Sequence, residues 1–173
     1  LDATGLTPPN KTNAPGGAIN IRADDVTLRN IAVDYDSSST DNAVEVQSDN
    51  ELSNVTVDGL DITNTATPGD GGVAAINLES QTNATVKNNQ IDGGAIGISF
   101  TGDQTGSGTI NVTGNSIDAN DGNEEGSVTE GIFIFGDLSS KDIQVENNQV
   151  ADSGVGSRDI KIGSGGSALA KSV

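Results

Sequence analysis

The chain has 173 residues, of which 32% are hydrophobic and 2% aromatic, so one compact core of ordinary build would be underfilled. Its 25 acidic and 8 basic residues give a formal net charge of −17, which disfavours nucleic acid and anionic membranes as partners. Histidine and cysteine are absent, which excludes disulfides, Ser-His-Asp and Cys-His catalysis and His-ligated metal sites, and no apolar stretch of about 20 residues is present that could insert in a membrane.

A pattern of alternating apolar and polar residues, eight residues long, occurs five times. The copies start 29, 29, 26 and 33 residues apart and cover 26–33, 55–62, 84–91, 110–117 and 143–150. A shorter pattern alternates with them, at 18–21, 43–46, 75–78, 95–98, 131–134 and 159–162. Both patterns alternate with a period of two, which predicts strands with Val26, Leu28 and Val33 facing inward in the first copy.

Repeats of this length indicate a solenoid, because one repeat cannot bury its apolar face until neighbouring repeats stack on it. Equivalent residues of successive coils would then lie about 4.8 Å apart, which builds an aliphatic core that needs few aromatic residues. We predict an all-β parallel β-helix of about five to six coils with 20–36 residues per coil. The chain is expected to form one domain over 1–173, with the repeats in approximately 17–163.

One polar position of the long pattern also repeats. Asn89, Asn115 and Asn148 fall in a single column of the predicted stack. Stacked side-chain amides can hydrogen-bond along the helix axis and to turn backbone, so we predict a structural asparagine ladder.

The repeats Val-Lys-Asn-Asn-Gln-Ile-Asp at 86–92 and Val-Glu-Asn-Asn-Gln-Val at 145–150 resemble those of the pectate-lyase-like superfamily. The resemblance covers roughly residues 17–163 and implies a right-handed parallel β-helix. The superfamily includes polysaccharide lyases, glycoside hydrolases, epimerases, phage tailspikes, surface adhesins and periplasmic metal-handling proteins. The fold therefore does not choose a function. By analogy with exported members, we expect an extracellular or cell-surface protein.

Several polar residues form outward columns in the predicted stack. Arg29, Asp58 and Lys87 could be arranged as in a lyase, with a basic residue and carboxylate-bound calcium, but opposite charges on adjacent strands attract without any catalysis. Threonines at 27, 56 and 85 form a column that Asn111 and Gln144 end, which is too short for an ice-binding array. Asn-x-Thr sequons occur at 10, 54, 83 and 111 and would accept glycans in an organism that performs that chemistry, but three of them lie in repeat columns, so the periodicity alone can generate these matches.

The segment Asp118 to Glu125 concentrates oxygen ligands around a glycine, as loops that bind hard cations do. Its spacing differs from the EF-hand pattern. We consider it a candidate Ca²⁺ site, and the acidity of the whole chain has two interpretations: hydration of a halophilic protein in salt, or collection of divalent cations. The candidate ligands are Asp118, Asn120, Asp121, Asn123 and Glu124.

The sequence Gly-Ile-Phe-Ile-Phe at 131–135 places two aromatic residues at outward positions. If Ile132 and Ile134 face inward, Phe133 and Phe135 face outward, beside residues 97 and 99 of the preceding coil. Two interpretations remain open. The rings border an apolar patch for a sugar face or a partner chain, or the loop at 101–109 covers them.

A β-helix has two open ends, and neither terminus of the sequence has an amphipathic helical segment that would cover one. We therefore predict end-to-end self-association or continuation into neighbouring domains. The first residues resemble the tail of a preceding coil, so we expect a processed chain or a segment of a longer protein. We predict an extracellular structural or binding module of a cell-surface or secreted adhesin, fibre or tailspike-like protein, with carbohydrate as a candidate partner. The alternative is a polysaccharide lyase or glycoside hydrolase, or an inactive relative, acting on acidic polysaccharide.

Overall fold

The computed structural model describes residues 17–35, 42–47, 51–64, 74–93, 95–102, 107–118, 130–151 and 158–163. Within these ranges all regular structure is β-strand, joined by turns. The strands are β1 (Gly17–Ile21), β2 (Thr27–Arg29), β3 (Ala32–Tyr35), β4 (Asn42–Val46), β5 (Val55–Asp58), β6 (Asp61–Asn64), β7 (Ala74–Glu79), β8 (Ala84–Lys87), β9 (Gln90–Asp92), β10 (Ile96–Thr101), β11 (Gly108–Thr113), β12 (Ser116–Asp118), β13 (Glu130–Phe135), β14 (Lys141–Glu146), β15 (Gln149–Ala151) and β16 (Arg158–Gly163).

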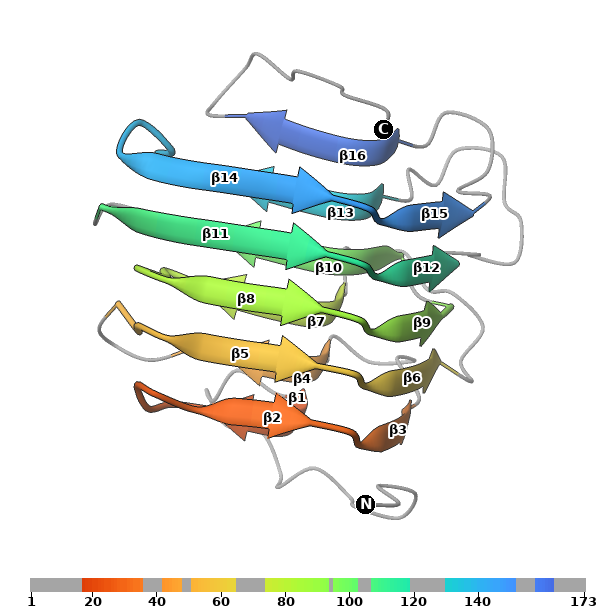
Figure 1. Ribbon diagram of the computed structural model, residues 1–173. Helices are drawn as coiled ribbons and strands as arrows, with labels where there is room; N and C mark the ends of the chain where they lie inside the picture. Colours follow the sequence, from red (N-terminus) through yellow and green to blue (C-terminus); the bar gives the residue numbers. More distant parts are fainter. Residues whose placement is uncertain are drawn as a thin grey trace.

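The strands form three parallel sheets, and each coil adds one strand to each sheet in turn (Figure 1). Sheet A has the order β1-β4-β7-β10-β13-β16, sheet B has β2-β5-β8-β11-β14, and sheet C has β3-β6-β9-β12-β15. The predicted right-handed parallel β-helix is confirmed. The described strands form about four turns, a small difference from the five to six coils predicted.

The core is a set of apolar columns that run along the helix axis. In sheet B, Val57 pairs with Leu28 on one side and with Val86 on the other. In sheet C, Ile62 pairs with Ile91 in the same manner. The inward-facing side chains of these columns are buried in the middle coils, whereas Leu28 in the first coil is only partly buried. Aliphatic side chains of similar size stacked at the strand spacing fill this narrow interior, which explains the low aromatic content.

The fourth copy of the short pattern lies two residues later than predicted. Ile98 pairs with Ile76, and Phe100 pairs with Leu78, so the copy that matches the other coils is 97–100 and not 95–98. A shift of two residues leaves the inward and outward alternation unchanged, and for this reason the sequence pattern could not detect it. Phe100 is thereby fully buried in the core.

The bend between sheets B and C uses a column of residues with left-handed backbone. Asn30, Asn88 and Asn147 each have φ of 54°, and glycines at 59 and 114 occupy the same position in the intervening coils. Asparagine and glycine tolerate this conformation better than other residues do. The alternation of the two residue types is therefore explained by backbone geometry.

The predicted asparagine ladder follows directly after this bend and is confirmed. Asn115 Oδ1 accepts hydrogen bonds from the backbone N–H of Asn89 at 3.0 Å and from its Nδ2 at 2.9 Å. Asn148 Oδ1 accepts the equivalent pair from Asn115, at 3.0 and 2.9 Å. Each of the three amides also donates to a carbonyl of the preceding coil, those of Val57, Val86 and Val112. The ladder thus satisfies the polar groups of a buried turn.

Candidate functional site

Sheet A presents two outward columns of side chains, which we call the sheet A face. The first column consists of Asn20, Glu45, Asn77, Ser99, Phe133 and Lys161, paired in register along the six strands. The second column contains Gln47, Glu79, Thr101, Phe135 and Gly163. The sheet A face therefore changes from amides and carboxylates on its first strands to aromatic rings on β13, followed by Lys161 and Gly163 on β16.

Glu45 is a buried carboxylate in the first column. Its side chain is only 2% exposed, and Asn77 Nδ2 lies 3.1 and 3.3 Å from its two carboxylate oxygens. Asn42 Nδ2 also donates to Glu45 Oε2. Burial raises the pKa of Glu45, and the nearby Glu79 charge adds to this effect, whereas the two amide donors oppose it. The amides thus hold Glu45 in a fixed position and partly offset its loss of hydration.

Glu79 lies one strand along in the second column and is more accessible. Its side chain is partly exposed, and Gln47 Nε2 donates to its Oε2 atom. A further hydrogen bond links the next two strands: Thr101 Oγ1 donates to Asn77 Oδ1 at 3.3 Å. Amide, hydroxyl and carboxylate groups are therefore oriented by each other across adjacent strands.

The outward prediction for the two phenylalanines is confirmed. Ile132 and Ile134 are fully buried, whereas Phe135 is 40% exposed and is the one large hydrophobic side chain that is exposed in the described part of the chain. The rings of Phe133 and Phe135 stack, with centroids 5.7 Å apart and planes 8° from parallel. Phe135 pairs with Gly163, which has no side chain to cover the ring on that side.

The Phe133 ring is in contact with Lys161, a residue that the sequence pattern did not single out. Its Nζ lies 4.5 Å from the centroid of Phe133, a cation–π contact, and 3.0 Å from Glu130 Oε1. Glu130 is 6% exposed, so this ion pair is largely withdrawn from solvent. The alternation of the short pattern could have placed Lys161 on this face, since it occupies the same position as Phe133 in the next copy.

The predicted neighbours of the rings are confirmed in part. Ser99 pairs with Phe133, as predicted. Gly97 is instead level with Gly131 of the next strand and faces the core: a Cβ added to Gly97 would be 2.4 Å from Ile117 Cγ2. The prediction that the 101–109 loop covers the rings depends on 103–106, which lie outside the described residues.

The candidate calcium loop falls largely outside the described residues. Asp118 is the last residue of β12, is exposed, and pairs with Asp92 and Ala151. The other four candidate ligands, Asn120, Asp121, Asn123 and Glu124, belong to the undescribed segment 119–129. Over the described ranges, no three or more His, Cys, Asp or Glu side chains come together in a way that could hold a metal. The calcium site therefore stays a prediction.

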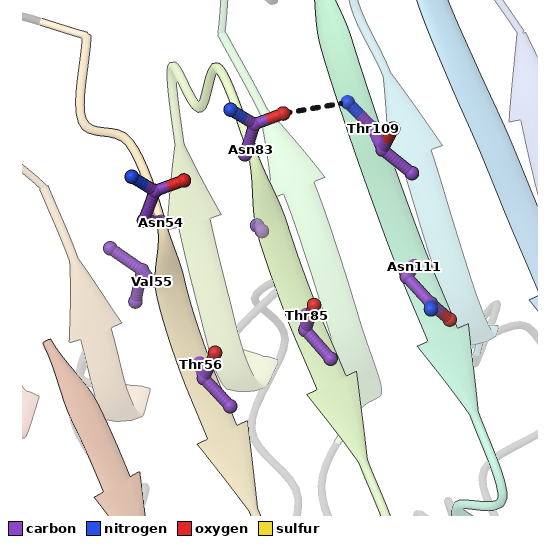
Figure 2. Close-up of a pocket in the computed structure, with 8 residues that line it drawn as sticks. Asn54, Val55, Thr56, Asn83, Thr85, Thr109 and Asn111 are labelled. Carbon is purple, nitrogen blue, oxygen red and sulfur yellow. Dashed lines mark hydrogen bonds between the residues drawn. The ribbon is translucent and has the colours of Figure 1, made fainter. Parts of the chain in front are cut away.

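Sheet B has a different outer surface, made of asparagine and threonine side chains. A shallow depression of about 230 Å³ lies between β5, β8 and β11 (Figure 2). Its lining includes the asparagines of three sequons, with Asn83 Oδ1 accepting a hydrogen bond from the Thr109 backbone N–H at 3.0 Å. The lining residues are Asn54, Val55, Thr56, Asn83, Ala84, Thr85, Thr109 and Asn111. This surface has no aromatic ring and no charged group in its lining.

The Arg29, Asp58 and Lys87 column forms on sheet B as predicted. Asp58 pairs with Arg29 and with Lys87 in the strand register, and Lys87 Nζ lies 3.5 Å from Asp58 Oδ2. The hydrogen bond from Asn88, followed by the Lys87 charge, lowers the pKa of Asp58. This arrangement fits attraction between stacked opposite charges on neighbouring strands.

Two searches of known proteins give no relative: none of the curated proteins and none of the solved structures matches the chain. Among the described residues, no helix has the length and apolarity needed to cross a bilayer. A family model described as a protein of unknown function, DUF1565, matches residues 16–170. This range contains the sixteen strands of the described part of the chain, from β1 to β16. The chain therefore belongs to the DUF1565 family of parallel β-helix proteins.

Proposed function

We propose that this chain is a carbohydrate-binding β-helical module of a secreted or cell-surface protein of the adhesin, fibre or tailspike kind. The observation that carries the proposal is the stacked pair of Phe133 and Phe135, with Phe135 40% exposed on a face whose other side chains are polar or charged. Exposed apolar patches rimmed by polar groups are typical of interaction sites.

The chemistry of the sheet A face suits a sugar. An aromatic ring offers a flat apolar surface to the C–H face of a pyranose, while carboxylate and amide groups accept and donate hydrogen bonds to its hydroxyls. Glu79 and Thr101 follow Phe135 along the second column on successive strands. Their spacing is set by the sheet, so the groups need little reorganisation on binding.

The enzymatic alternative has weaker support. A lyase acting on a uronate needs a basic residue free to remove a proton. Lys161 on the sheet A face is held by Glu130, and Lys87 on sheet B is paired with Asp58. Both ion pairs are explained by the stacking of strands, and binding is therefore the function we propose.

The proposal is tested by calorimetric titration with neutral oligosaccharides of glucose, mannose and N-acetylglucosamine. We expect Phe135→Ala to lower the affinity for the bound sugar about tenfold, because an aromatic anchor contributes 1 kcal/mol or more. Asn111→Ala, in the depression on sheet B, is the matched control and should bind like the unchanged protein. Since Phe135 is already 40% exposed, its replacement should leave the melting temperature nearly unchanged.

Two results would contradict the proposal. In the first, Phe133→Ala and Phe135→Ala leave binding unchanged and lower only the melting temperature, which would mean that the rings serve stability alone. In the second, Asn111→Ala abolishes binding and Phe135→Ala does not, which would move the site to sheet B.

A further inference from the structure

We infer that the sugar bound by the sheet A face is an amino sugar, with its protonated amine at the Glu79 carboxylate and a neighbouring ring on Phe135. This inference rests on the proposed function and names the chemical class of its ligand. It differs from the acidic polysaccharide that the enzymatic alternative would require.

The charge of the face favours a cation. Glu45, Glu79 and Glu130 lie on or beside it. The cations nearest to them are Lys161, Arg22, whose charge acts on Glu45, and Arg158, which pairs with Glu130 in the strand register. The ammonium of Lys161 is already paired with Glu130, whose Oε1 lies 3.0 Å away, and lies over the ring of Phe133, so it is less able to bind an acidic sugar. The chain as a whole carries a formal charge of −17. A uronate would therefore meet repulsion, whereas a protonated amine would be attracted.

Glu79 is the carboxylate that can take part. Both oxygens of the buried Glu45 are occupied by amide donors from Asn42 and Asn77. At Glu79, Gln47 Nε2 donates to Oε2, and no donor among the described residues reaches Oε1. The Glu79 side chain is also partly exposed, so a ligand can approach it. Gln47 thus orients this carboxylate through one oxygen, and the described part of the chain leaves the second oxygen available to a ligand.

The distance between the two anchors fits consecutive sugar units. Glu79 pairs with Thr101, and Thr101 is followed on the next strand by Phe135, so the two anchors are two strand steps apart. At about 4.8 Å per step this separation is about 10 Å. One pyranose ring on Phe135 places the next unit of an oligosaccharide over Thr101, with its amine directed toward Glu79. A charge-assisted hydrogen bond at that point is stronger than one between neutral groups.

The test compares binding of glucosamine oligomers, the same oligomers N-acetylated, and oligogalacturonate, measured by calorimetry at fixed ionic strength. Glu79→Gln is compared with Asp61→Asn, which removes one exposed carboxylate from sheet C and changes the net charge equally. We expect Glu79→Gln to weaken glucosamine binding on the order of tenfold and Asp61→Asn less than about twofold. Binding of the N-acetylated oligomer should be unchanged in both variants, and Phe135→Ala should weaken both ligands.

The outcomes separate the two proposals. Equal effects of Glu79→Gln and Asp61→Asn would mean that glucosamine is attracted only by overall charge, and stronger binding of oligogalacturonate than of glucosamine would reverse the selectivity. Either result overturns this inference, and the proposed function survives it if Phe135→Ala still weakens sugar binding. If none of the three ligands nor any neutral oligosaccharide binds, the proposed function fails and this inference fails with it.

Discussion

Asparagine has two structural roles at adjacent positions of each coil. At the bend it adopts the left-handed backbone, as Asn88 does with φ of 54°. One residue later, Asn89 and Asn115 turn inward and form the ladder. The first two coils replace the ladder residue by Ile31 and Leu60, and the Leu60 N–H is satisfied by Asn89 Oδ1 at 2.9 Å. The ladder therefore ends where an apolar side chain can fill the corner.

Replacing Asn115 by leucine should destabilise the protein by about 3 kcal/mol, because the buried Asn89 N–H and Val86 carbonyl lose their partners. The free energy of unfolding from urea titration measures the effect. Gln90→Ala, at an exposed position of β9, should change it by less than about 0.5 kcal/mol. Equal effects of the two substitutions would show that the ladder does not contribute to stability.

The buried carboxylate of Glu45 predicts a pH dependence. Because burial raises its pKa in the folded state above the ordinary value of 4.5, the native state binds the proton more tightly than the unfolded chain does. Its contribution to stability is therefore fully present below that ordinary value and is lost as pH rises through the folded pKa.

Glu45→Gln removes this titration. The melting temperature of the variant minus that of the unchanged protein should increase as pH rises from below 4.5 toward neutrality. Thermal unfolding followed by circular dichroism over a pH series measures the difference. A difference that is constant with pH, or that decreases, would contradict a raised pKa at Glu45.

Strands of the solenoid are also linked across several coils by a buried lysine. The Lys141 side chain has no exposed surface, and its Nζ lies 2.6 Å from the Gln81 carbonyl oxygen, 3.2 Å from that of Thr82 and 3.2 Å from Glu51 Oε1. Lys141 pairs with Gly108, where an added Cβ would be 2.1 Å from the Thr82 carbonyl oxygen. Glycine is therefore required on the strand between the lysine and its acceptors.

Lys141→Met should destabilise the protein by about 3 kcal/mol, because it removes a buried ammonium that donates to a carboxylate and two carbonyls. The control is Lys87→Met, which breaks the Lys87–Asp58 pair where both side chains are at least 29% exposed. That loss should be less than about 1 kcal/mol. Urea titration of both variants gives the two free energies of unfolding. A larger effect of Lys87→Met would show that the buried contacts of Lys141 do not stabilise the protein.

At the scale of the whole molecule, the formal charge of −17 opposes folding through repulsion between carboxylates. Added salt screens this repulsion, so the melting temperature should rise between about 10 mM and 500 mM NaCl, a range over which the Debye length falls from about 30 Å to a few ångströms. Differential scanning calorimetry at constant pH measures the change. A fall in the melting temperature would mean that favourable ion pairs outweigh the repulsion.

The ends of the stack predict association. Among the described strands, β2 and β14 each have a single neighbour in sheet B, and the core residues Leu28 and Val145 that they carry are only partly buried. A second copy that continues the stack would bury them. Light scattering coupled to size exclusion should therefore show a mass that increases with protein concentration in high salt. A monomer at every concentration would remove the fibre from the proposed functions.

The sequence by itself determined the parallel β-helix, the side that most residues of each strand face and the asparagine ladder, because each of these follows from a local period that repeats from coil to coil. Phe133 and Phe135 were found for the same reason. The tertiary structure decided the exact register of β10, the contact of Lys161 with Phe133, the burial of Glu45 and the reach of Lys141 to residues 60 and 90 positions earlier. These features depend on how coils of unequal length stack on one another, and a local alternation of period two is the same for every register that differs by two residues.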